Sequence, residues 1–365
     1  MKLGIVGLPN VGKTTLFNAL TNSDAESANY PYSTTGANIG AVTVPDKRLD
    51  FLKELHSPKK YTPATIEFVD IAGLARGASR GEGMGNKFLS HIRMTDAIIH
   101  VVRCFDDPDV AHIEEGGTNP LRDIEIINLE LVLADVEMVQ RRIERAKKAA
   151  KGDKKYIHEA EVFERLLAHM DDGSPARLFD CSHEDMEIIQ TSELLSLKPV
   201  IYAANMGESD IADGIDNSAY YTAVKKQADS ENTRAFAICA KIEQELVSLS
   251  AEDKELFLSE LGIGESGLYS LIRESYALLG LISFLTCGPD EVRAWTIKDG
   301  TVAQRAAGKI HSDIERGFIR AEIVSFADLE ASGTMAAAKE RGLVRLEGKE
   351  YVMRDGDVVN FRFNV

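Results

Sequence analysis

The chain has 365 residues, 44% of them hydrophobic and 27% charged, with a formal net charge of −16 at pH 7; this is enough for two or three globular domains with separate cores. The acidic excess excludes broad wrapping of nucleic acid, so that a contact with nucleic acid is expected only from a local basic patch. The sequence has no run of 18 apolar residues, which argues against a membrane-spanning helix. Its four cysteines are widely separated, which argues against a disulfide or zinc framework and indicates a reducing, cytoplasmic environment.

The first twenty residues predict a phosphate-binding site. Residues 3–6 form a short apolar run typical of a buried strand. Residues 7–14 read G-L-P-N-V-G-K-T and match G-x-x-x-x-G-K-[ST], and the apolar periodicity that follows predicts a helix. In this context Lys13 reaches the outer phosphates of a nucleoside triphosphate and Thr14 offers a hydroxyl to Mg²⁺. The phosphate-loop residues expected to bind the nucleotide are Asn10, Val11, Gly12, Lys13, Thr14 and Thr15.

Two further magnesium ligands are expected downstream of this loop. Thr34 lies in a polar segment before the strand-like residues 39–44, where NTPases of this class place switch I, whose threonine binds Mg²⁺ only when the third phosphate is present. The buried strand at 66–69 runs into D-I-A-G, which puts the Asp70 carboxylate where it holds Mg²⁺ through water and the Gly73 N–H near the γ-phosphate. The predicted magnesium ligands are therefore Thr14, Thr34 and Asp70.

The chain resembles the Obg-like ATPases, the YchF subfamily of translation-factor-related P-loop NTPases, in four segments. These segments are GLPNVGKTT, NYPYSTT, DIAGLARGASRGEGMGNKFLSHIR and NMGE. The resemblance covers essentially the whole chain and is most specific in the glycine-rich residues 73–93 and in the C-terminal module. It implies an α/β, Ras-like P-loop NTPase domain with a helical hairpin insertion and a C-terminal α+β ubiquitin-like (TGS) domain. The chain departs from the family after Thr34, where T-G-A replaces the usual acidic residue and proline.

The hydrolytic machinery lacks one familiar part. Leu74 follows D-x-x-G, where small GTPases carry a glutamine that orients water, and leucine neither donates nor accepts a hydrogen bond. The resemblance implies that His112 helps hydrolysis instead, although a lone loop histidine is more often a bystander; both interpretations stay open. We expect Gly73 and Lys13 to take part in catalysis. Potassium is a second candidate cation, held by the Asn10 amide oxygen, unless that amide only hydrogen-bonds its own loop.

A helical insertion is expected over residues 124–195. From residue 124 the apolar side chains recur at spacings of three and four, and the same spacing returns at 156–170. This pattern predicts two long amphipathic helices joined near Gly152, a helical hairpin. Its turn carries five lysines: Lys147, Lys148, Lys151, Lys154 and Lys155. A solvated helix end and a contact with ribosomal RNA both explain such a cluster.

The strand at 199–204 leads into Asn205-Met206-Gly207-Glu208, where GTPases have N-K-x-D. In GTPases the aspartate accepts hydrogen bonds from guanine N1–H and the 2-amino group, and adenine offers neither donor. Here Met206 replaces the lysine, and the extra methylene of Glu208 displaces its carboxylate. The sequence thus weakens the case for guanine, and the resemblance shifts the preference to ATP. We expect Asn205, Met206 and Glu208 to contact the base.

The expected domains are an NTPase domain of residues 1–123 and 196–280, interrupted by the insertion, and a module of mixed strands around one helix at 281–365. Basic and acidic side chains nearly balance in this module, so that an RNA role for it rests on the resemblance.

Three functions fit these features. The first is a Mg²⁺-dependent ATPase that hydrolyses ATP to ADP and phosphate and binds the ribosome or a ribosomal subunit, through ribosomal RNA, with no membrane or DNA partner. The second is a ribosome-associated GTPase of the Obg/Era type. The third is a nucleotide-gated scaffold for RNA or protein, which the intact Lys13, Thr14 and Asp70 disfavour. The ATPase is the function that we favour on sequence.

Overall fold

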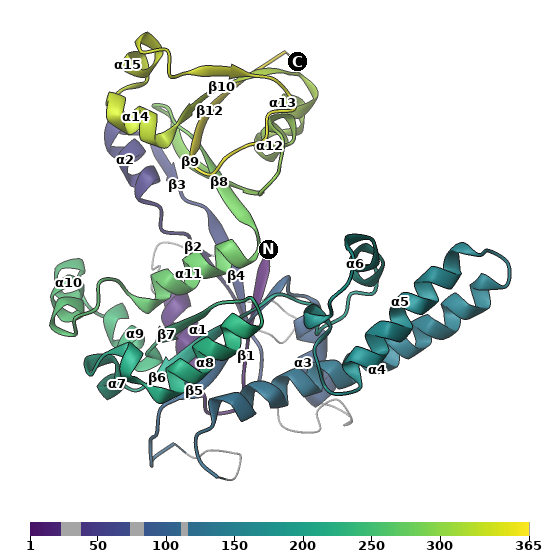
Figure 1. Ribbon diagram of the computed structural model, residues 1–365. Coiled ribbons are helices and arrows are strands. Elements are labelled where there is room, and N and C mark those ends of the chain that lie inside the picture. Colours follow the sequence, from purple (N-terminus) through teal and green to yellow (C-terminus); the bar gives the residue numbers. More distant parts are fainter. Residues whose placement is uncertain (23–37, 74–83, 111–115, 365) are drawn as a thin grey trace. The chain divides into compact units, whose positions relative to one another are not determined.

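Figure 1 shows the computed structural model of the chain, which describes residues 1–22, 38–73, 84–110 and 116–364. The chain divides into two compact units. The first consists of Met1–Ala41 and Glu67–Glu274, and the second of Val42–Ile66 and Ser275–Val365. Within the described ranges, no helix combines the length and the apolar character needed to cross a membrane.

The first unit is built on a six-stranded sheet with the order β2-β4-β1-β5-β6-β7. Its strands are β1 (Lys2–Val6), β2 (Asn38–Thr43), β4 (Thr65–Asp70), β5 (Ala97–Cys104), β6 (Val200–Met206) and β7 (Ala235–Ile238). The pairs from β4 to β7 are parallel, and every residue of β5 and β6 is buried, which explains their nearly continuous apolar sequences. Strands β2 and β4 lie on one side of β1, and β5, β6 and β7 lie on the other, so that the strand order reverses at β1. In α/β sheets, ligands bind at the carboxyl ends of the strands beside such a reversal.

The helices of this unit lie between its strands along the chain and after the last of them. They are α1 (Lys13–Asn22), α3 (Met84–Arg93), α7 (Glu208–Ala212), α8 (Ala219–Ser230), α9 (Ala240–Val247), α10 (Ala251–Glu260) and α11 (Gly267–Leu278), with a short 3₁₀ turn at Ile215–Asn217. The phosphate-loop helix α1 begins directly at Lys13. The predicted α/β, Ras-like fold class is confirmed.

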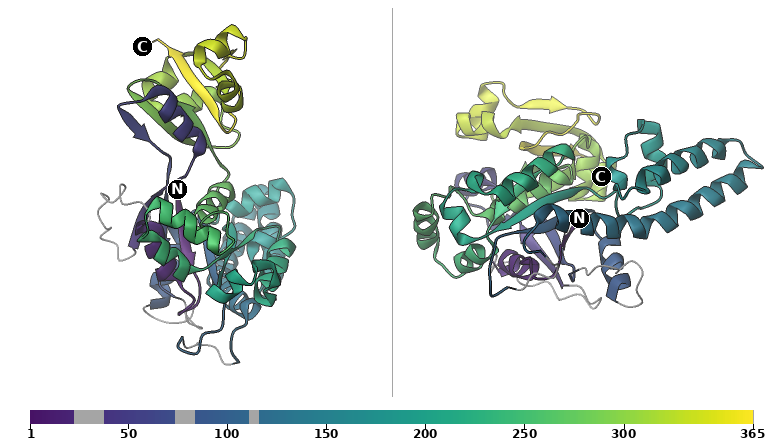
Figure 2. Two further views of the ribbon diagram at one scale, coloured as in Figure 1. Left: turned by 90° about the vertical axis from the view of Figure 1, so that its left-hand side faces the viewer. Right: turned by 60° about the horizontal axis from the view of Figure 1, so that its bottom comes forward.

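The helical hairpin is formed by α4 (Pro120–Ala150) and α5 (Lys155–Met170), with α6 (His183–Gln190) after it. Figures 1 and 2 show α4 and α5 side by side as an arm that extends beyond the sheet of the same unit. The side chain of Asn119 accepts a hydrogen bond from the Arg122 N–H at 3.2 Å and caps α4, and Pro120 occupies the first turn, where a missing N–H costs nothing. Apolar side chains of the three helices share one core, which includes Val139, Phe163, Leu166 and Ile189.

Buried polar contacts hold the base of this arm. The Asp135 carboxylate accepts hydrogen bonds from the backbone N–H groups of Leu195 at 2.9 Å and Ser196 at 2.7 Å, and from the Ser196 hydroxyl at 2.7 Å. Burial raises the pKa of Asp135, and these hydrogen bonds oppose that shift. Arg177, in the 3₁₀ turn Ala176–Leu178, pairs with Glu231 at 2.9 Å. Because unpaired buried polar groups are costly, these contacts fix the arm to the segment before β6 and to the end of α8.

The second unit is an α+β structure with the strand order β11-β10-β12-β8-β9-β3. Its strands are β3 (Lys60–Thr62), β8 (Leu281–Thr286), β9 (Glu291–Lys298), β10 (Phe318–Ser325), β11 (Arg345–Glu347) and β12 (Asp357–Phe363). Its helices are α2 (Lys47–His56), α12 (Ala303–Ile310), α13 (Ser312–Arg316), α14 (Phe326–Ser332) and α15 (Met335–Glu340). Successive residues of β8, Phe284 and Leu285, belong to two different apolar cores, as expected for a sheet covered on both faces.

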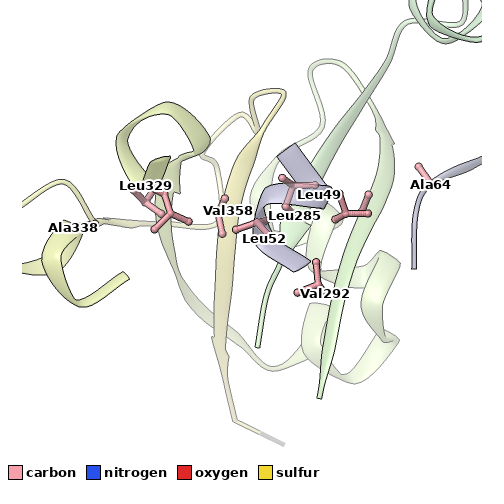
Figure 3. Close-up of a cluster of buried hydrophobic side chains, with 10 residues drawn as sticks. Leu49, Leu52, Ala64, Leu285, Val292, Leu329, Ala338 and Val358 are labelled. Carbon is pink, nitrogen blue, oxygen red and sulfur yellow. The ribbon is translucent and has the colours of Figure 1, made fainter. Parts of the chain in front are cut away.

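The structure corrects one predicted boundary. Residues 42–66, which the sequence interpretation gave to the NTPase domain, pack with the C-terminal residues in the second unit. Strand β3 pairs in parallel with β9. Leu49 and Leu52 of α2 are fully buried with Leu285 and Val292 (Figure 3). The C-terminal module therefore obtains part of its core from a segment more than 200 positions earlier, which no local pattern announces.

Candidate nucleotide-binding site

The loop between β1 and α1 is held in a conformation that requires glycine. Gly12 has a φ of +95°, and a Cβ added there would collide with the side-chain amide of Asn205. Asn10 also has a positive φ, of 62°, a conformation that asparagine tolerates better than most residues. Helix α1 starts within this loop, since the Leu16 N–H donates to the Gly12 carbonyl at 2.9 Å. The loop therefore presents backbone N–H groups and a helix N-terminus at one point, an arrangement that suits an anion.

Lys13 supplies a buried positive charge to this loop. Its side chain is buried, and Nζ donates to the Leu8 carbonyl at 2.6 Å. Burial lowers the pKa of Lys13 to about 8, and the charge of Asp70 opposes that shift. A buried ammonium group with so little compensation gains most from an anionic ligand, because a charge-assisted contact in a dry site is strong.

Asp70, Thr14 and Gly73 converge on Lys13. The Thr14 hydroxyl donates to Asp70 Oδ2 at 3.3 Å. Asp70 Oδ1 is buried without a hydrogen-bond partner in the described part of the chain, and burial raises the pKa of this carboxyl. A Cβ added at Gly73 would lie 3.1 Å from Lys13 Nζ, so that the Gly73 backbone lies beside the ammonium group. A hydroxyl and a carboxylate with an unsatisfied oxygen fit the small protein ligand set that Mg²⁺ uses beside phosphates and water.

A cavity of about 720 Å³ continues from this loop to the end of β6. Its lining includes Asn10, Gly12 and Thr15 of the phosphate loop together with Met206 and Glu208. The Met206 side chain is buried at the end of β6, and Glu208 opens α7. Cavities of this size hold small organic ligands, so that the phosphate loop and the predicted base motif share one site.

Asn205 braces the two ends of this site. Its Nδ2 donates to the Val11 carbonyl at 2.9 Å, and its Oδ1 accepts from the Ala240 N–H at 2.9 Å. The side chain is 5% exposed, and each end of its amide has a backbone partner. Asn205 thus lines the cavity, and its amide connects the phosphate loop to the start of α9; its contact with the base stays a prediction.

Arg103 organises a wall of the cavity that the sequence did not predict. This side chain, buried at the end of β5, donates to the carbonyls of Phe105 at 3.1 Å, Val110 at 3.0 Å and Asp107 at 3.3 Å. Its guanidinium group also lies 4.6 Å from the centre of the Phe105 ring. Phe105, Asp107 and Val110 line the cavity. An arginine within an apolar strand is the sequence signal that points to this role, because such a charge is rarely buried without partners.

Three predicted positions fall outside the described residues. They are Thr34, the third expected magnesium ligand, Leu74, in the place of the glutamine, and His112, the candidate catalytic histidine. Their roles stay predictions of the sequence.

Comparison with known proteins places this site in a family. The family model described as "50S ribosome-binding GTPase" matches residues 2–133, and the YchF-GTPase C-terminal model, described as a protein of unknown function, matches residues 281–364. The ribosome-binding ATPase YchF of Bacillus subtilis (strain 168) is 54% identical over 365 residues, which cover 99% of each chain. The protein of the same name from Escherichia coli O157:H7 is 48% identical over 100% of this chain and 99% of its own.

Solved structures agree with this placement. The Schizosaccharomyces pombe YchF GTPase is 40% identical and has a TM-score of 0.88, with 99% of this chain and 97% of that chain covered. A GTP-binding protein from Pyrococcus horikoshii OT3 has a TM-score of 0.62 at 19% identity over 100% of both chains, and it shows the fold alone. The identities over full length and the phosphate-loop geometry lead to one assignment, which confirms the resemblance seen in the sequence: this chain belongs to the YchF family of P-loop NTPases.

Proposed function

We propose that this chain is an ATPase, which binds ATP with Mg²⁺ in the cavity described above and hydrolyses it to ADP and phosphate, and that it binds the ribosome. The observation that carries the proposal is a phosphate loop with a buried Lys13 that opens into a cavity ending in Met206 and Glu208, where GTPases have lysine and aspartate. The printed names of the Bacillus subtilis and Escherichia coli relatives, ribosome-binding ATPases, support both parts of it.

Each group near the phosphate loop has a proposed role. Lys13 contacts the outer phosphates, and the Gly73 N–H binds an oxygen of the γ-phosphate. Thr14 and Asp70, with Thr34, are the residues that would hold Mg²⁺, and the cation would neutralise charge on the phosphates. His112 is proposed to position the attacking water, because leucine at position 74 has no group that does so.

A GTPase of the same architecture is the second candidate. It is favoured by the printed description of the family model that matches residues 2–133 and by the name of the Schizosaccharomyces pombe protein, both of which say GTPase. Phosphate release measured with ATP and with GTP, at equal concentrations and in the presence of Mg²⁺, separates the two. Release from ATP that exceeds release from GTP supports the proposal. Release from neither nucleotide above background would leave only the scaffold.

Potassium is expected to speed ATP hydrolysis more than sodium does, on the order of tenfold. Asn10 lines the cavity beside the phosphate loop, and its amide oxygen is of the type that binds monovalent cations. Such a cation offsets the charge that develops on the phosphates, in place of an arginine finger. The measurement is steady-state ATPase activity at fixed ionic strength in potassium and then in sodium.

Two variants separate the amide from the backbone conformation at this position. Asn10→Ala removes the amide and also strains the positive φ of 62°, whereas Asn10→Gly removes the amide and relieves that strain. If the amide oxygen holds the cation, both variants lose the potassium effect. Equal wild-type rates in the two salts contradict the prediction, and a potassium effect that survives in Asn10→Gly moves the cation elsewhere.

The lysines at the tip of the hairpin are the proposed contact with ribosomal RNA. Lys147 pairs with Glu164, and Lys155 pairs with Asp153. Lys148 and Lys151 are exposed and have no ion-pair partner within the ranges that the structure covers. Unpaired lysines on a projecting arm are well placed for phosphate groups, and each such contact releases counterions.

Replacing Lys148 and Lys151 together with glutamine is expected to weaken co-sedimentation with ribosomes and to reduce the salt dependence of binding by roughly two in the slope of log K against log salt. The matched control replaces Lys225 and Lys226 of α8 with glutamine, which removes the same charge from another exposed site. An equal effect of both pairs would show that only net charge matters, and no effect of either pair would remove the hairpin tip from the interface.

A further inference from the structure

The ammonium group of Lys241 contacts both carboxylate oxygens of Glu208. Lys241 lies in the first turn of α9 and Glu208 in the first turn of α7, and both line the cavity. Lys241 Nζ lies 3.1 Å from Glu208 Oε1 and 3.2 Å from Oε2. The ammonium group therefore faces both carboxylate oxygens at once. The pKa of Lys241 is raised, first because of this hydrogen bond.

This contact distinguishes Glu208 from the other acidic side chains of the cavity. Asp106 accepts from the Tyr220 hydroxyl at 3.0 Å, and Asp210 accepts from the Gly207 N–H at 3.2 Å. The Asp107 carboxylate accepts from the Asp109 N–H at 2.9 Å. Among the described residues, Glu208 alone of these four acids has a cationic partner, and it is the acid that stands in the place of the guanine-binding aspartate.

The contact with Lys241 affects which base the Glu208 carboxylate is able to bind. Guanine presents two adjacent donors, N1–H and the 2-amino group, and a carboxylate recognises them by using its two oxygens together. Adenine has no such donor pair, since its N1 is an acceptor. A lysine that occupies both oxygens competes with guanine for the same acceptors and does not compete with adenine in that way.

We propose that Lys241 is a positioning residue for base selectivity: by holding both oxygens of Glu208, it withholds from guanine the acceptor pair that guanine requires. The inference rests on the proposed ATPase function and deepens it, because it assigns part of the preference for ATP to a residue outside N-M-G-E. The two side chains are 69% and 46% exposed, and exposed ion pairs are weak, so that the effect is a moderate one.

The test measures the binding of fluorescent, non-hydrolysable ATP and GTP analogues to wild type and to Lys241→Met. Methionine keeps most of the side-chain length and removes the charge. The ratio of GTP affinity to ATP affinity is expected to rise about fivefold, the upper range for an exposed ion pair. Lys241→Arg, which retains a cation, is expected to keep the wild-type ratio. Lys226→Met, on the exposed face of α8, is the control for loss of a charge.

A double-mutant cycle shows whether Lys241 acts through Glu208. In a Glu208→Gln background the carboxylate is absent, so that Lys241→Met is expected to leave the ratio unchanged. An unchanged ratio in Lys241→Met alone overturns the inference, and so does an equal shift in the Glu208→Gln background. If wild type binds GTP more tightly than ATP, the proposed ATPase function itself is contradicted, whatever the variants do. Failure of the proposed function is thereby distinguished from failure of the inference about Lys241.

Discussion

Replacing Lys13 with alanine is expected to weaken ATP binding by about 100-fold. The buried ammonium group lies in the phosphate loop and beside Gly73, and a charge-assisted contact with a phosphate in such a site contributes roughly 1.5–3 kcal/mol. The measurement is a titration with a fluorescent ATP analogue. Lys2→Ala, which removes a partly exposed lysine of β1 that pairs with Glu67 at 3.6 Å, is the matched control and is expected to bind as wild type does.

The same variant tests the cause of the low pKa of Lys13. Because burial of the charge is unfavourable in the protein without nucleotide, Lys13→Ala is not expected to lower the melting temperature of that form. At an ATP concentration near the wild-type Kd, it is expected to remove nearly all of the rise in melting temperature that ATP causes in wild type. Unchanged ATP affinity in Lys13→Ala would overturn the assignment of the phosphate site, and a large fall in stability without nucleotide would show that Lys13 acts on the fold.

Replacing Asn205 with alanine is expected to lower the free energy of unfolding by about 2 kcal/mol and to weaken ATP binding roughly tenfold. The change leaves the Val11 carbonyl and the Ala240 N–H without the hydrogen bonds that the Asn205 side chain makes to them. Loss of this brace loosens the phosphate loop from the segment that follows β7. Urea denaturation and nucleotide titration measure the two effects.

Asn205→Asp provides a second comparison. Aspartate still accepts from the Ala240 N–H, but its buried carboxylate has no N–H to donate and faces the Val11 carbonyl oxygen. Its stability and its ATP affinity are expected to fall at least as far as those of Asn205→Ala, because an unpaired buried charge is costly. If Asn205→Ala retained full ATP affinity, the brace would have no part in binding, and Asn205 would be a residue of the fold alone.

The sequence predicts those parts of the site that depend on short-range patterns. Gly12, Lys13 and Thr14 belong to one strand–loop–helix unit, so that their spacing alone fixes their relation to one another. Asp70 is the last residue of β4, which pairs with β1, and the carboxyl ends of parallel strands meet at one edge of a sheet. The hairpin is also predictable, because the spacing of its apolar residues extends over many turns.

Other features depend on packing between distant segments and leave no local signal. The pair of Lys241 and Glu208 joins positions 33 residues apart, and neither position shows in the sequence that the other is its partner. Leu49 and Leu52 are ordinary apolar residues of a helix until β8 and β9 cover them. Arg103 stands out only as a charge in an apolar strand, and its three carbonyl partners are set by the path of the loop.

The end of the cavity that Met206 and Glu208 line is expected to favour ATP over GTP. The most direct measurement is the equilibrium affinity of the wild-type chain for ATP and for GTP, with Mg²⁺ present, compared with a variant that carries Met206→Lys and Glu208→Asp. ATP is expected to bind wild type more tightly, and the double variant is expected to shift toward GTP, because it restores the N-K-x-D pattern. Wild type that binds GTP more tightly than ATP would contradict the account and make the chain a GTPase.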